Sequence, residues 1–231
     1  MSTPGRIVIL TGAGISAECG LGTFRDAGGL WSQYDLSEVA TPEGFARNPD
    51  LVHDFYNARR INCLEAKPNA AHHALARLQA ERADVTIVTQ NIDDLHERGG
   101  ARQVIHMHGA LMQALCATCQ ARWPAPCEMF AADPCPRCAA PATRPDIVWF
   151  GEIPYHMDHI GEMLSQAALF VAIGTSGEVY PAAGFVEEAR AMGAETLELN
   201  LEPSGGANRF HSGRYGPATE IVPAWVDEIL G

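Results

Sequence analysis

Short apolar runs rich in β-branched residues recur along the chain. They occupy residues 6–10, 84–89, 169–173 and 196–200. Runs of this length and composition are typical of parallel strands that are buried on both faces. Helical patterns lie between several of these runs, notably over residues 71–82 and 181–192. Because strands alternate with helices, the pattern predicts an α/β fold with a doubly wound parallel sheet.

Two segments interrupt this alternation. Residues 20–70 show no pattern of a core strand and contain a predicted helix over 44–65. Residues 110–146 contain five of the seven cysteines, four of them in paired spacings, and six of the fifteen prolines. We interpret these segments as insertions that form a smaller lobe beside the sheet. The prediction is one domain over 1–231, with a large lobe from about 1–26, 83–109 and 147–231. A helical module over about 27–82 and a cysteine-bearing module over about 110–146 make up the small lobe.

The composition is that of a globular protein and limits the classes of partner. Of the 231 residues, 47% are hydrophobic and 19% are charged, and the formal net charge is −12. A negative chain repels nucleic acids and anionic membrane surfaces, so we expect neither as a partner. No run approaches the ~20 apolar residues of a membrane span, and the first residues lack the apolar segment of a signal peptide. We expect a cytoplasmic protein with reduced thiols, acting as a monomer.

A glycine-rich turn follows the first predicted strand. Residues 12–17 read Gly-Ala-Gly-Ile-Ser-Ala and fit the pattern G-x-G-x-x-G/A at the start of a predicted helix. Such a turn lets the backbone approach a diphosphate at a helix N-terminus, although a strand-to-helix turn without a ligand has the same pattern. The acidic residue that a dehydrogenase carries ~20 residues later is absent. Residues 22–31 instead form a glycine-rich loop with Arg25, which we expect to close over a bound nucleotide.

Four cysteines are paired with a spacing that is typical of a zinc site. They are Cys116, Cys119, Cys135 and Cys138, in the pattern C-x2-C-x15-C-x2-C. Each pair supplies two sulfurs to one edge of a tetrahedron, and four thiolates leave no position open for water, so the predicted zinc is structural. Two redox-active dithiols are the alternative interpretation. Cys19, Cys63 and Cys127 are expected to be ordinary buried or half-buried thiols.

Polar residues directly follow the predicted strands, where ligands bind in open α/β sheets. After the second run comes Gln90-Asn91-Ile92-Asp93, and helix capping by Asn91 or Asp93 is the alternative to ligand binding. His106 and His108 share one side if their segment is extended. His108 precedes a glycine and suits a general base, while a metal ligand or a core histidine is the alternative. Later strands are followed by Gly174-Thr175-Ser176 and Asn200-Leu201-Glu202, which would cap helices or hold ribose and phosphate oxygens.

Taken together, these motifs resemble the sirtuins, a family of NAD-dependent protein-lysine deacylases. The resemblance covers nearly the whole chain in the family's order. It is carried by residues 12–16, 23–26, 90–93, 108–109, 148–152, 174–176 and 200–202, and by the four paired cysteines. It implies a Rossmann-like large lobe, NAD as co-substrate, one structural zinc ion, and acylated-lysine proteins as substrates.

The resemblance also assigns residues to an NAD site. The implied cofactor-binding residues are Gly12, Ala13, Gly14, Ile15, Ser16, Glu18, Thr23, Phe24, Arg25, Asp26, Trp31, Gln90, Asn91, Ile92, Asp93, Gly174, Thr175, Ser176, Asn200, Leu201, Glu202 and Ala218. Asn91 and His108 are the implied catalytic residues. The acyl oxygen would attack C1′ of the nicotinamide ribose, and His108 would then take a proton from a ribose hydroxyl. The implied products are nicotinamide, free lysine and 2′-O-acyl-ADP-ribose.

A Tyr-x-x-Arg pair narrows the range of acyl groups that we expect as substrates. Tyr56 and Arg59 are three residues apart on the predicted helix, so they share a face, and they resemble the pair found in class III sirtuins, which act on succinyl- and malonyl-lysine. A phenol and a guanidinium suit a terminal carboxylate. The alternative is an exposed Arg59 beside a packed Tyr56, and we expect the neighbouring Arg60 to be exposed. The resemblance further implies that the substrate peptide adds as a strand along Val148, Phe150, Gly151 and Glu152.

Other functions remain open at this point. The chain would be a plain deacetylase if Tyr56 and Arg59 are structural, or a mono-ADP-ribosyltransferase if the ribose is delivered to a protein. It would be a non-catalytic sensor of NAD or ADP-ribose if it acts only through a partner. The presence of Asn91 and His108 favours an enzyme. We therefore predict deacylation of succinyl-, malonyl- and acetyl-lysine.

Overall fold

The centre of the computed structural model, which describes residues 5–21 and 34–231, is a six-stranded parallel sheet. In spatial order its strands are β3 (Val104–His106), β2 (Val85–Thr89), β1 (Ile7–Thr11), β7 (Leu169–Ile173), β8 (Glu195–Asn200) and β9 (Ser212–Tyr215). Every neighbouring pair runs parallel. The chain moves outward from β1 to β3 on one side and from β7 to β9 on the other. The predicted doubly wound α/β fold is confirmed, and its topological switch point lies between β1 and β7.

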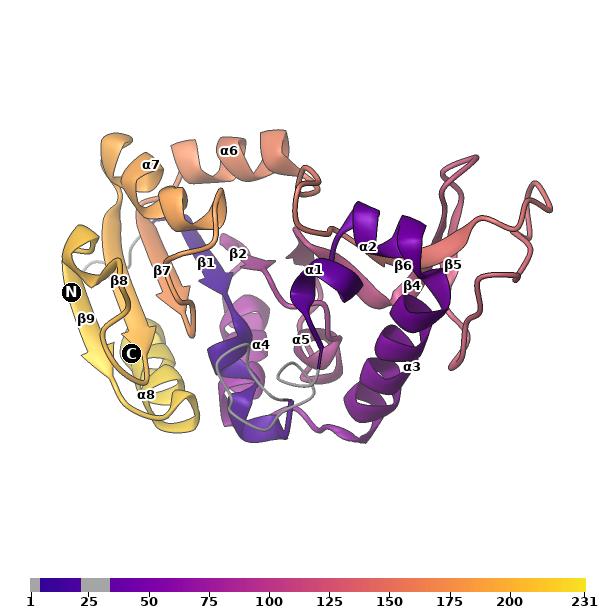
Figure 1. The fold of residues 1–231 in the computed structure, drawn as a ribbon. Helices are drawn as coiled ribbons and strands as arrows, with labels where there is room; N and C mark the ends of the chain where they lie inside the picture. The colour runs from indigo at the N-terminus through magenta and orange to yellow at the C-terminus, as the bar shows by residue number, and fades with distance from the viewer. Residues whose placement is uncertain (1–4, 22–33) are drawn as a thin grey trace.

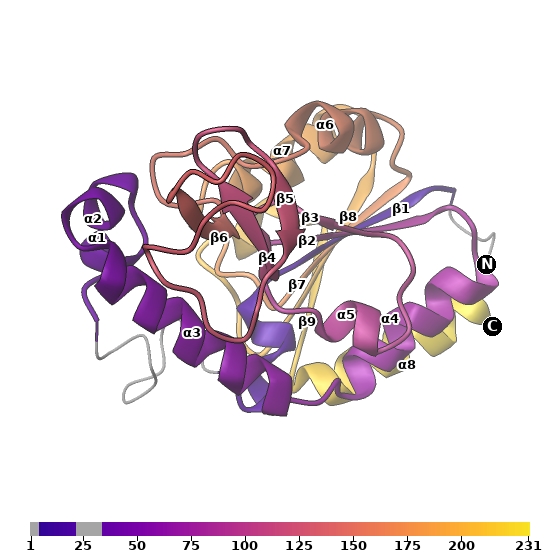
Figure 2. The ribbon, with the colours of Figure 1, turned by 90° about the vertical axis from the view of Figure 1, so that its right-hand side faces the viewer.

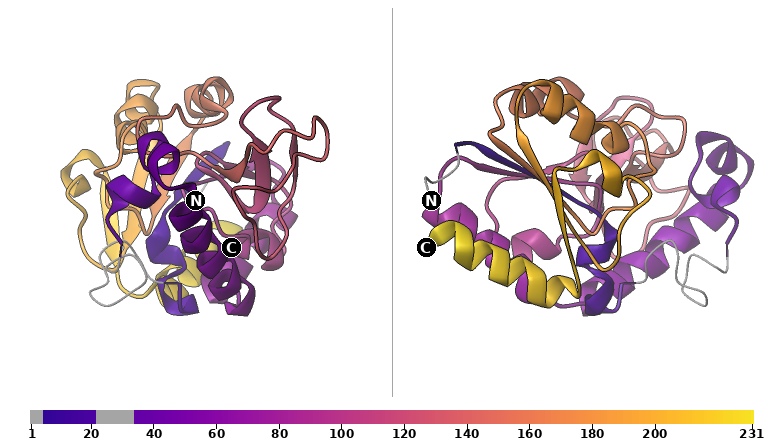
Figure 3. Two further views of the ribbon diagram at one scale, coloured as in Figure 1. Left: turned by 45° about the vertical axis from the view of Figure 1, so that its right-hand side comes forward. Right: turned by 90° about the vertical axis from the view of Figure 1, so that its left-hand side faces the viewer.

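Helices cover both faces of this sheet (Figure 1). Side chains alternate between the two faces of a strand, so Ile7 and Ile9 pack with α4 (Ala70–Glu81) and α8 (Ala218–Leu230). Val8 and Leu10 pack on the other face with α6 (Met157–Ser165) and α7 (Phe185–Ala191). Figure 2 and the right panel of Figure 3 show α4 and α8 side by side beneath the sheet, with α6 and α7 above it. The continuously apolar strand runs follow from this two-sided burial.

A smaller lobe lies beside the sheet, to the right in Figure 1. Its antiparallel sheet has the order β5 (Arg122–Pro124), β4 (Gly109–Cys116), β6 (Thr143–Ile147). Against it pack α1 (Leu36–Val39), α2 (Pro42–Arg47) and α3 (Pro49–Glu65). Within the described part of residues 20–70 there is no strand, as predicted. The remaining short helix, α5 (Leu95–Arg98), lies under the large sheet near α4.

The single helix predicted over 44–65 is wrong in its first part. The chain forms α2 and α3 with a break at Asn48, whose side chain caps α3 by accepting a hydrogen bond from the Leu51 N–H at 3.1 Å. Pro49 follows as the first residue of α3, where its missing N–H costs nothing. The helix predicted over 181–192 likewise begins later, as a 3-10 turn (Ala182–Gly184) that leads into α7. None of the helices in the described part of the chain has the length and apolar character that a membrane span requires.

Candidate active site

The glycine turn after β1 interlocks with the end of β7 at the switch point. The Gly12 N–H donates to the Ile173 carbonyl and the Gly14 N–H to the Gly174 carbonyl, both at 2.9 Å. A Cβ on Gly14 would lie 2.7 Å from the Gly174 Cα, and Gly174 itself has φ +62°. Neither position tolerates a side chain, because two backbones meet there. The glycines therefore serve close backbone packing, whether or not a diphosphate is bound.

The helix expected to start at this turn is not formed. Two 3-10 turns, Ala13–Ile15 and Ala17–Cys19, take its place and end at Gly20, which has φ +81°. The Ile15 carbonyl accepts a hydrogen bond from Asn69 Nδ2 at 2.8 Å. Since an α-helix needs that carbonyl for the N–H of residue 19, the side chain of Asn69 diverts the helix at its first turn.

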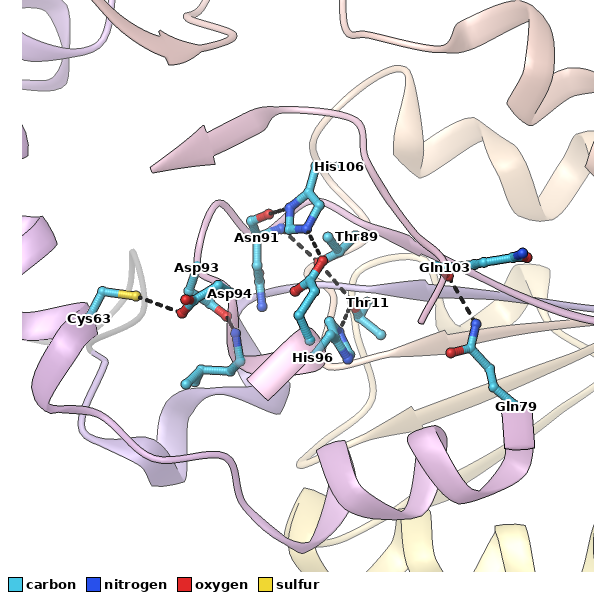
Figure 4. A network of polar contacts seen from close by, with 12 residues as sticks. Thr11, Cys63, Gln79, Thr89, Asn91, Asp93, Asp94, His96, Gln103 and His106 are labelled. Carbon is cyan, nitrogen blue, oxygen red and sulfur yellow. Dashed lines mark hydrogen bonds and ion pairs between the residues drawn. The ribbon is translucent and has the colours of Figure 1, made fainter. Parts of the chain in front are cut away.

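Ser16, Asn91 and Asp93 form a buried polar chain beside the turn. Asn91 Nδ2 donates to the Gly12 carbonyl at 3.1 Å and to Ser16 Oγ at 3.3 Å, and Ser16 Oγ donates to Asp93 Oδ2 at 3.3 Å. Asp93 also accepts from the Leu95 N–H at 3.1 Å (Figure 4). Burial raises the pKa of Asp93, against the lowering effect of these hydrogen bonds. The capping alternative thus holds in part for Asp93 and does not hold for Asn91, whose amide is turned toward the glycine turn.

His108 is half-buried next to this chain. Its Nδ1 lies 3.1 Å from the Gln90 carbonyl. A carbonyl only accepts, so Nδ1 carries the proton and Nε2 is left as the basic nitrogen. Burial lowers the pKa of His108, and the imidazole is therefore neutral at pH 7. This is the protonation state that a general base needs.

The surroundings of His106 favour the protonated ring, whereas those of His108 favour the neutral ring. Its Nε2 lies 2.7 Å from Glu97 Oε1 and its Nδ1 lies 3.2 Å from the Asn91 carbonyl. Burial alone lowers the pKa of His106, but the hydrogen bond and charge of Glu97 outweigh burial and raise it. Both ring nitrogens are engaged with acceptors (Figure 4). His106 therefore supports the backbone at Asn91, and His108 is the better candidate for the base.

The ends of β7 and β8 meet on the other side of the switch point. Asn200 Nδ2 donates to the Thr175 carbonyl at 2.8 Å, which joins the two loops. Ser176 Oγ accepts from the Glu178 N–H at 3.3 Å. Glu18 reaches the first turn of α8, where it accepts from Thr219 Oγ1 at 2.8 Å. Leu201 and Glu202 are exposed and Ala218 is half-buried at the start of α8.

Tyr56 and Arg59 lie together on α3, in the small lobe. Tyr56 is fully buried, and its hydroxyl accepts a hydrogen bond from Trp149 Nε1 at 3.0 Å. The Arg59 guanidinium carbon is 5.6 Å from the centre of the Phe55 ring and 5.8 Å from that of Tyr56. Burial lowers the pKa of Arg59, while Tyr56 and Asp93 act in the opposite direction. The exposed-arginine alternative is wrong for this half-buried side chain.

The expectation for Arg60 is also wrong. Its side chain has no exposed surface, and Nε donates to the Cys127 carbonyl at 3.1 Å. The segment around Cys127 covers this face of α3. Because Cys127 lies 67 residues from Arg60 in the sequence, the residues around Arg60 do not predict the contact. The Cys127 thiol itself is exposed, contrary to the prediction, whereas Cys19 is half-buried and Cys63 buried as predicted.

The segment after β6 contains the predicted peptide-binding residues Val148, Phe150, Gly151 and Glu152. The Val148 N–H donates to the His108 carbonyl and the Phe150 N–H to the Ala40 carbonyl, both at 2.9 Å. These two N–H groups are thus used within the chain, and the segment lies directly against His108. Phe150 is half exposed and Ile153 more so, which leaves two apolar side chains exposed along this segment.

The four paired cysteines converge in the small lobe. Their sulfurs all lie within 4.8 Å of one another, and the Cys116–Cys138 and Cys119–Cys135 pairs are each 3.7 Å apart. A tetrahedron with Zn–S bonds of about 2.3 Å has edges of about 3.8 Å. The Cys119 N–H points at the Cys116 sulfur at 3.4 Å, and the Arg137 N–H at the Cys135 sulfur at 3.4 Å. The predicted cluster is confirmed, and its geometry fits a structural zinc rather than two dithiols.

Five residues of the predicted NAD site, Thr23, Phe24, Arg25, Asp26 and Trp31, lie outside the described residues. Their assignment stays a prediction from the resemblance.

Comparisons with known proteins bear on the family. The model of the Sir2 family matches residues 12–181. The chain belongs to the Sir2 family. It is 59% identical over 230 residues to a protein of Caulobacter vibrioides named NAD-dependent protein deacylase, with 97% of both chains covered. A protein of the same name from Salmonella typhimurium is 54% identical over 97% of this chain and 84% of its own length.

Solved Sir2 structures share the fold. A Sir2 homologue in complex with NAD is 34% identical, with a TM-score of 0.89 over 97% of this chain and 90% of that one. A Sir2 bound to an acetylated peptide is 27% identical, with a TM-score of 0.82 over 96% and 92% of the two chains. The parallel sheet and the cysteine-bearing lobe of this chain are therefore those of a Sir2 protein.

This Sir2 chain also has two buried histidines, His72 and His96, close to the polar chain of Ser16 and Asn91. His96 Nε2 lies 2.9 Å from Thr11 Oγ1, which donates to Thr89 Oγ1 at 2.8 Å, and Thr89 Oγ1 accepts from the Asn91 N–H at 3.0 Å. His72 Nε2 lies 3.4 Å from Ser16 Oγ. Burial lowers the pKa of His72 to about 4. His72 thus contacts Ser16 directly, and His96 supports Asn91 through Thr11 and Thr89. No local sequence pattern marks these two neutral rings.

Proposed function

We propose that this Sir2-family NAD-dependent protein deacylase removes succinyl and malonyl groups, and also acetyl groups, from lysines of acylated proteins. The observation that supports this proposal most directly is the pair formed by Tyr56 and Arg59 beside the Val148–Glu152 segment. A guanidinium and a phenol that converge in a partly apolar site match a carboxylate at the end of a short chain. Acetyl-lysine enters the same site without that added binding energy.

Charge at this site favours an acidic acyl group. Arginine keeps its proton at neutral pH even when burial lowers its pKa, so Arg59 presents a positive charge in a half-buried position. Burial raises the pKa of Tyr56, which keeps the phenol protonated as a donor. The carboxylate would thus receive a charge-assisted hydrogen bond and a neutral one. A neutral acyl group would form no charge-assisted hydrogen bond with Arg59.

Asn91, His108 and the Gln90 carbonyl each have one role in the proposed reaction. NAD supplies an electrophilic ribose carbon and nicotinamide as leaving group. Asn91, whose amide is held against the glycine turn by Gly12 and Ser16, would orient the ribose end. His108 Nε2, neutral and unprotonated, takes the proton from a ribose hydroxyl. The Gln90 carbonyl stabilises the imidazolium that results, because it keeps its hydrogen bond to Nδ1.

The experiment that tests the proposal uses one peptide in acetyl, succinyl and malonyl forms. NAD-dependent release of free lysine is measured for each form, with His108→Gln as the inactive control. We expect faster removal of the acidic groups. Removal of acetyl alone would refute the acyl preference, leave a deacetylase, and make Tyr56 and Arg59 structural residues.

The same assay separates the other two candidate functions. With labelled NAD, a mono-ADP-ribosyltransferase leaves label on protein, whereas a deacylase leaves it on a small molecule. A non-catalytic sensor binds NAD and releases no nicotinamide in the presence of acyl peptide. We propose a monomer, which light scattering on the purified protein tests.

A further inference from the structure

One buried hydrogen bond fixes the direction in which the Tyr56 hydroxyl can donate. Trp149 Nε1 lies 3.0 Å from the Tyr56 oxygen, and the exposed fractions of the two side chains are 3% and 1%. An indole N–H can only donate, so the Tyr56 oxygen is the acceptor in this bond. The proton of the Tyr56 hydroxyl is consequently directed toward a different group.

Trp149 is itself held from two sides. The guanidinium carbon of Arg144 lies 3.5 Å from the centre of the Trp149 ring. Arg144 binds Glu152 through both terminal nitrogens, at 2.8 and 2.9 Å. Glu152 in turn accepts a hydrogen bond from the Trp149 N–H at 2.8 Å. The stacked Arg144 packs on the face of the indole, and the main-chain bond ties the backbone of Trp149 to the same ion pair, so both favour the orientation that reaches Tyr56.

We propose that Trp149 is a positioning residue for acyl selectivity, because its indole N–H holds the Tyr56 hydroxyl as a hydrogen-bond donor toward the distal carboxylate of the acyl group. This inference rests on the proposed function. A carboxylate only accepts, so a phenol that turned a lone pair toward it would repel it. Acetyl-lysine has no distal carboxylate, and its turnover does not use the direction of this hydroxyl.

The test replaces the indole and keeps an aromatic ring for Arg144 to stack on. In Trp149→Phe, we expect the ratio of kcat/KM for succinyl-lysine to that for acetyl-lysine to fall about fivefold, the equivalent of one net hydrogen bond. The fall should come from a higher KM for the succinyl peptide. Trp123→Phe on β5 is the matched control and leaves the ratio unchanged. An equal loss on both peptides, or a ratio that does not change, would overturn the role of Trp149.

A double-mutant cycle with Tyr56→Phe shows whether Trp149 acts through the phenol. We expect Trp149→Phe to lower the ratio no further once Tyr56 has lost its hydroxyl, and losses that add would contradict the inference. If Trp149→Phe fails to fold, 3-benzothienyl-alanine at this position replaces the N–H by sulfur in the same shape. Should the unchanged protein show no preference for succinyl-lysine, the proposed function itself fails. A succinyl-to-acetyl ratio that is unchanged by the loss of the N–H overturns only this inference.

Discussion

Replacing Arg59 by methionine removes the proposed partner of the acyl carboxylate and keeps most of the side-chain volume. The Arg59 guanidinium rests against the Phe55 and Tyr56 rings, at 5.6 and 5.8 Å from their centres. A methionine can occupy the same apolar contact. The substitution therefore tests the charge with little change in packing.

The structure sets the size of the expected effect. A hydrogen bond to a charged group in a partly buried site contributes about 2–3 kcal/mol, which corresponds to a loss of about 30- to 160-fold in kcat/KM for the succinyl peptide. For deacetylation we expect the smaller loss of a cation–π contact of Arg59, about 0.5–1 kcal/mol, or about two- to fivefold. The two substrates should thus separate by about an order of magnitude or more.

The assay is release of free lysine from matched succinyl and acetyl peptides at several peptide concentrations. Arg102→Met, which removes an exposed arginine on the large lobe, is the control and changes neither rate. Arg59→Lys keeps the charge, loses the planar fork and falls between Arg59→Met and the unchanged protein. Equal losses on both peptides in Arg59→Met would refute the reasoning, since a purely structural arginine affects every acyl group alike.

Three further predictions concern the metal, the base and the His106 ion pair. Cys135→Ser should hold less than half of the about one zinc ion per chain, whereas Cys127→Ser should hold all of it, and metal analysis that finds undiminished zinc in Cys135→Ser would exclude these ligands. Because the base is active when neutral and burial lowers the pKa of His108, kcat/KM should rise with pH to a plateau with a midpoint below about 6.5; a midpoint above 7 in the pH–rate profile would argue against His108. Because the folded-state pKa of His106 is raised, its pairing with Glu97 stabilises the protein below pH ~6.5 and is lost as pH rises through the raised pKa. Glu97→Gln should therefore lower the free energy of unfolding by ~0.5–1 kcal/mol at pH 6 and by less at pH 8.5, and denaturant titrations with an equal loss at both values would contradict this.

The sheet could be predicted from the sequence where burial on both faces leaves a continuous apolar run. The four predicted strands correspond to β1, β2, β7 and β8 with ends that differ by one residue at most. The two edge strands could not be predicted in this way. β9 reads Ser-Gly-Arg-Tyr and all four residues are exposed, so it pairs through its backbone and carries no apolar signal. The apolar pattern of α8 is interrupted by Pro223, a residue that argues against a helix interior.

The candidate site was predictable where function requires residue types at fixed spacing. The structure brings the four paired cysteines together and places Tyr56 and Arg59 close together on α3, whereas the roles of the polar strand ends and of the Tyr56–Arg59 pair stay predictions. Contacts across the chain were not predictable. Arg60 is buried by a segment 67 residues away, and Asn69 diverts the turn after β1 across 54 residues. Neither contact leaves a trace in local composition, because each depends on the tertiary arrangement.

Helix α3 carries the proposed acyl-binding pair and also contacts the cysteine-bearing module. We therefore expect the structural zinc to influence the acyl-binding pair. The acyl-binding pair is Tyr56 and Arg59, whereas Asn57 and Arg60 form hydrogen bonds with the segment between the two cysteine pairs. Asn57 exchanges hydrogen bonds with the Met129 backbone at 2.9 and 3.0 Å, and Arg60 bonds the Cys127 carbonyl at 3.1 Å.

Residues 125–142 form no helix or strand, so four thiolates around one ion would contribute to holding this segment in place, beside its hydrogen bonds to α3. If the ion is lost, the segment is released, and α3 loses the hydrogen bonds that fix its rear face. Arg60 would then be left buried without its carbonyl acceptor, or would have to turn out to solvent and move the helix. We therefore expect removal of the zinc by a chelator to lower the succinyl-to-acetyl ratio of kcat/KM, although the cysteine cluster lies apart from Tyr56 and Arg59; an unchanged ratio in the zinc-free protein would contradict this.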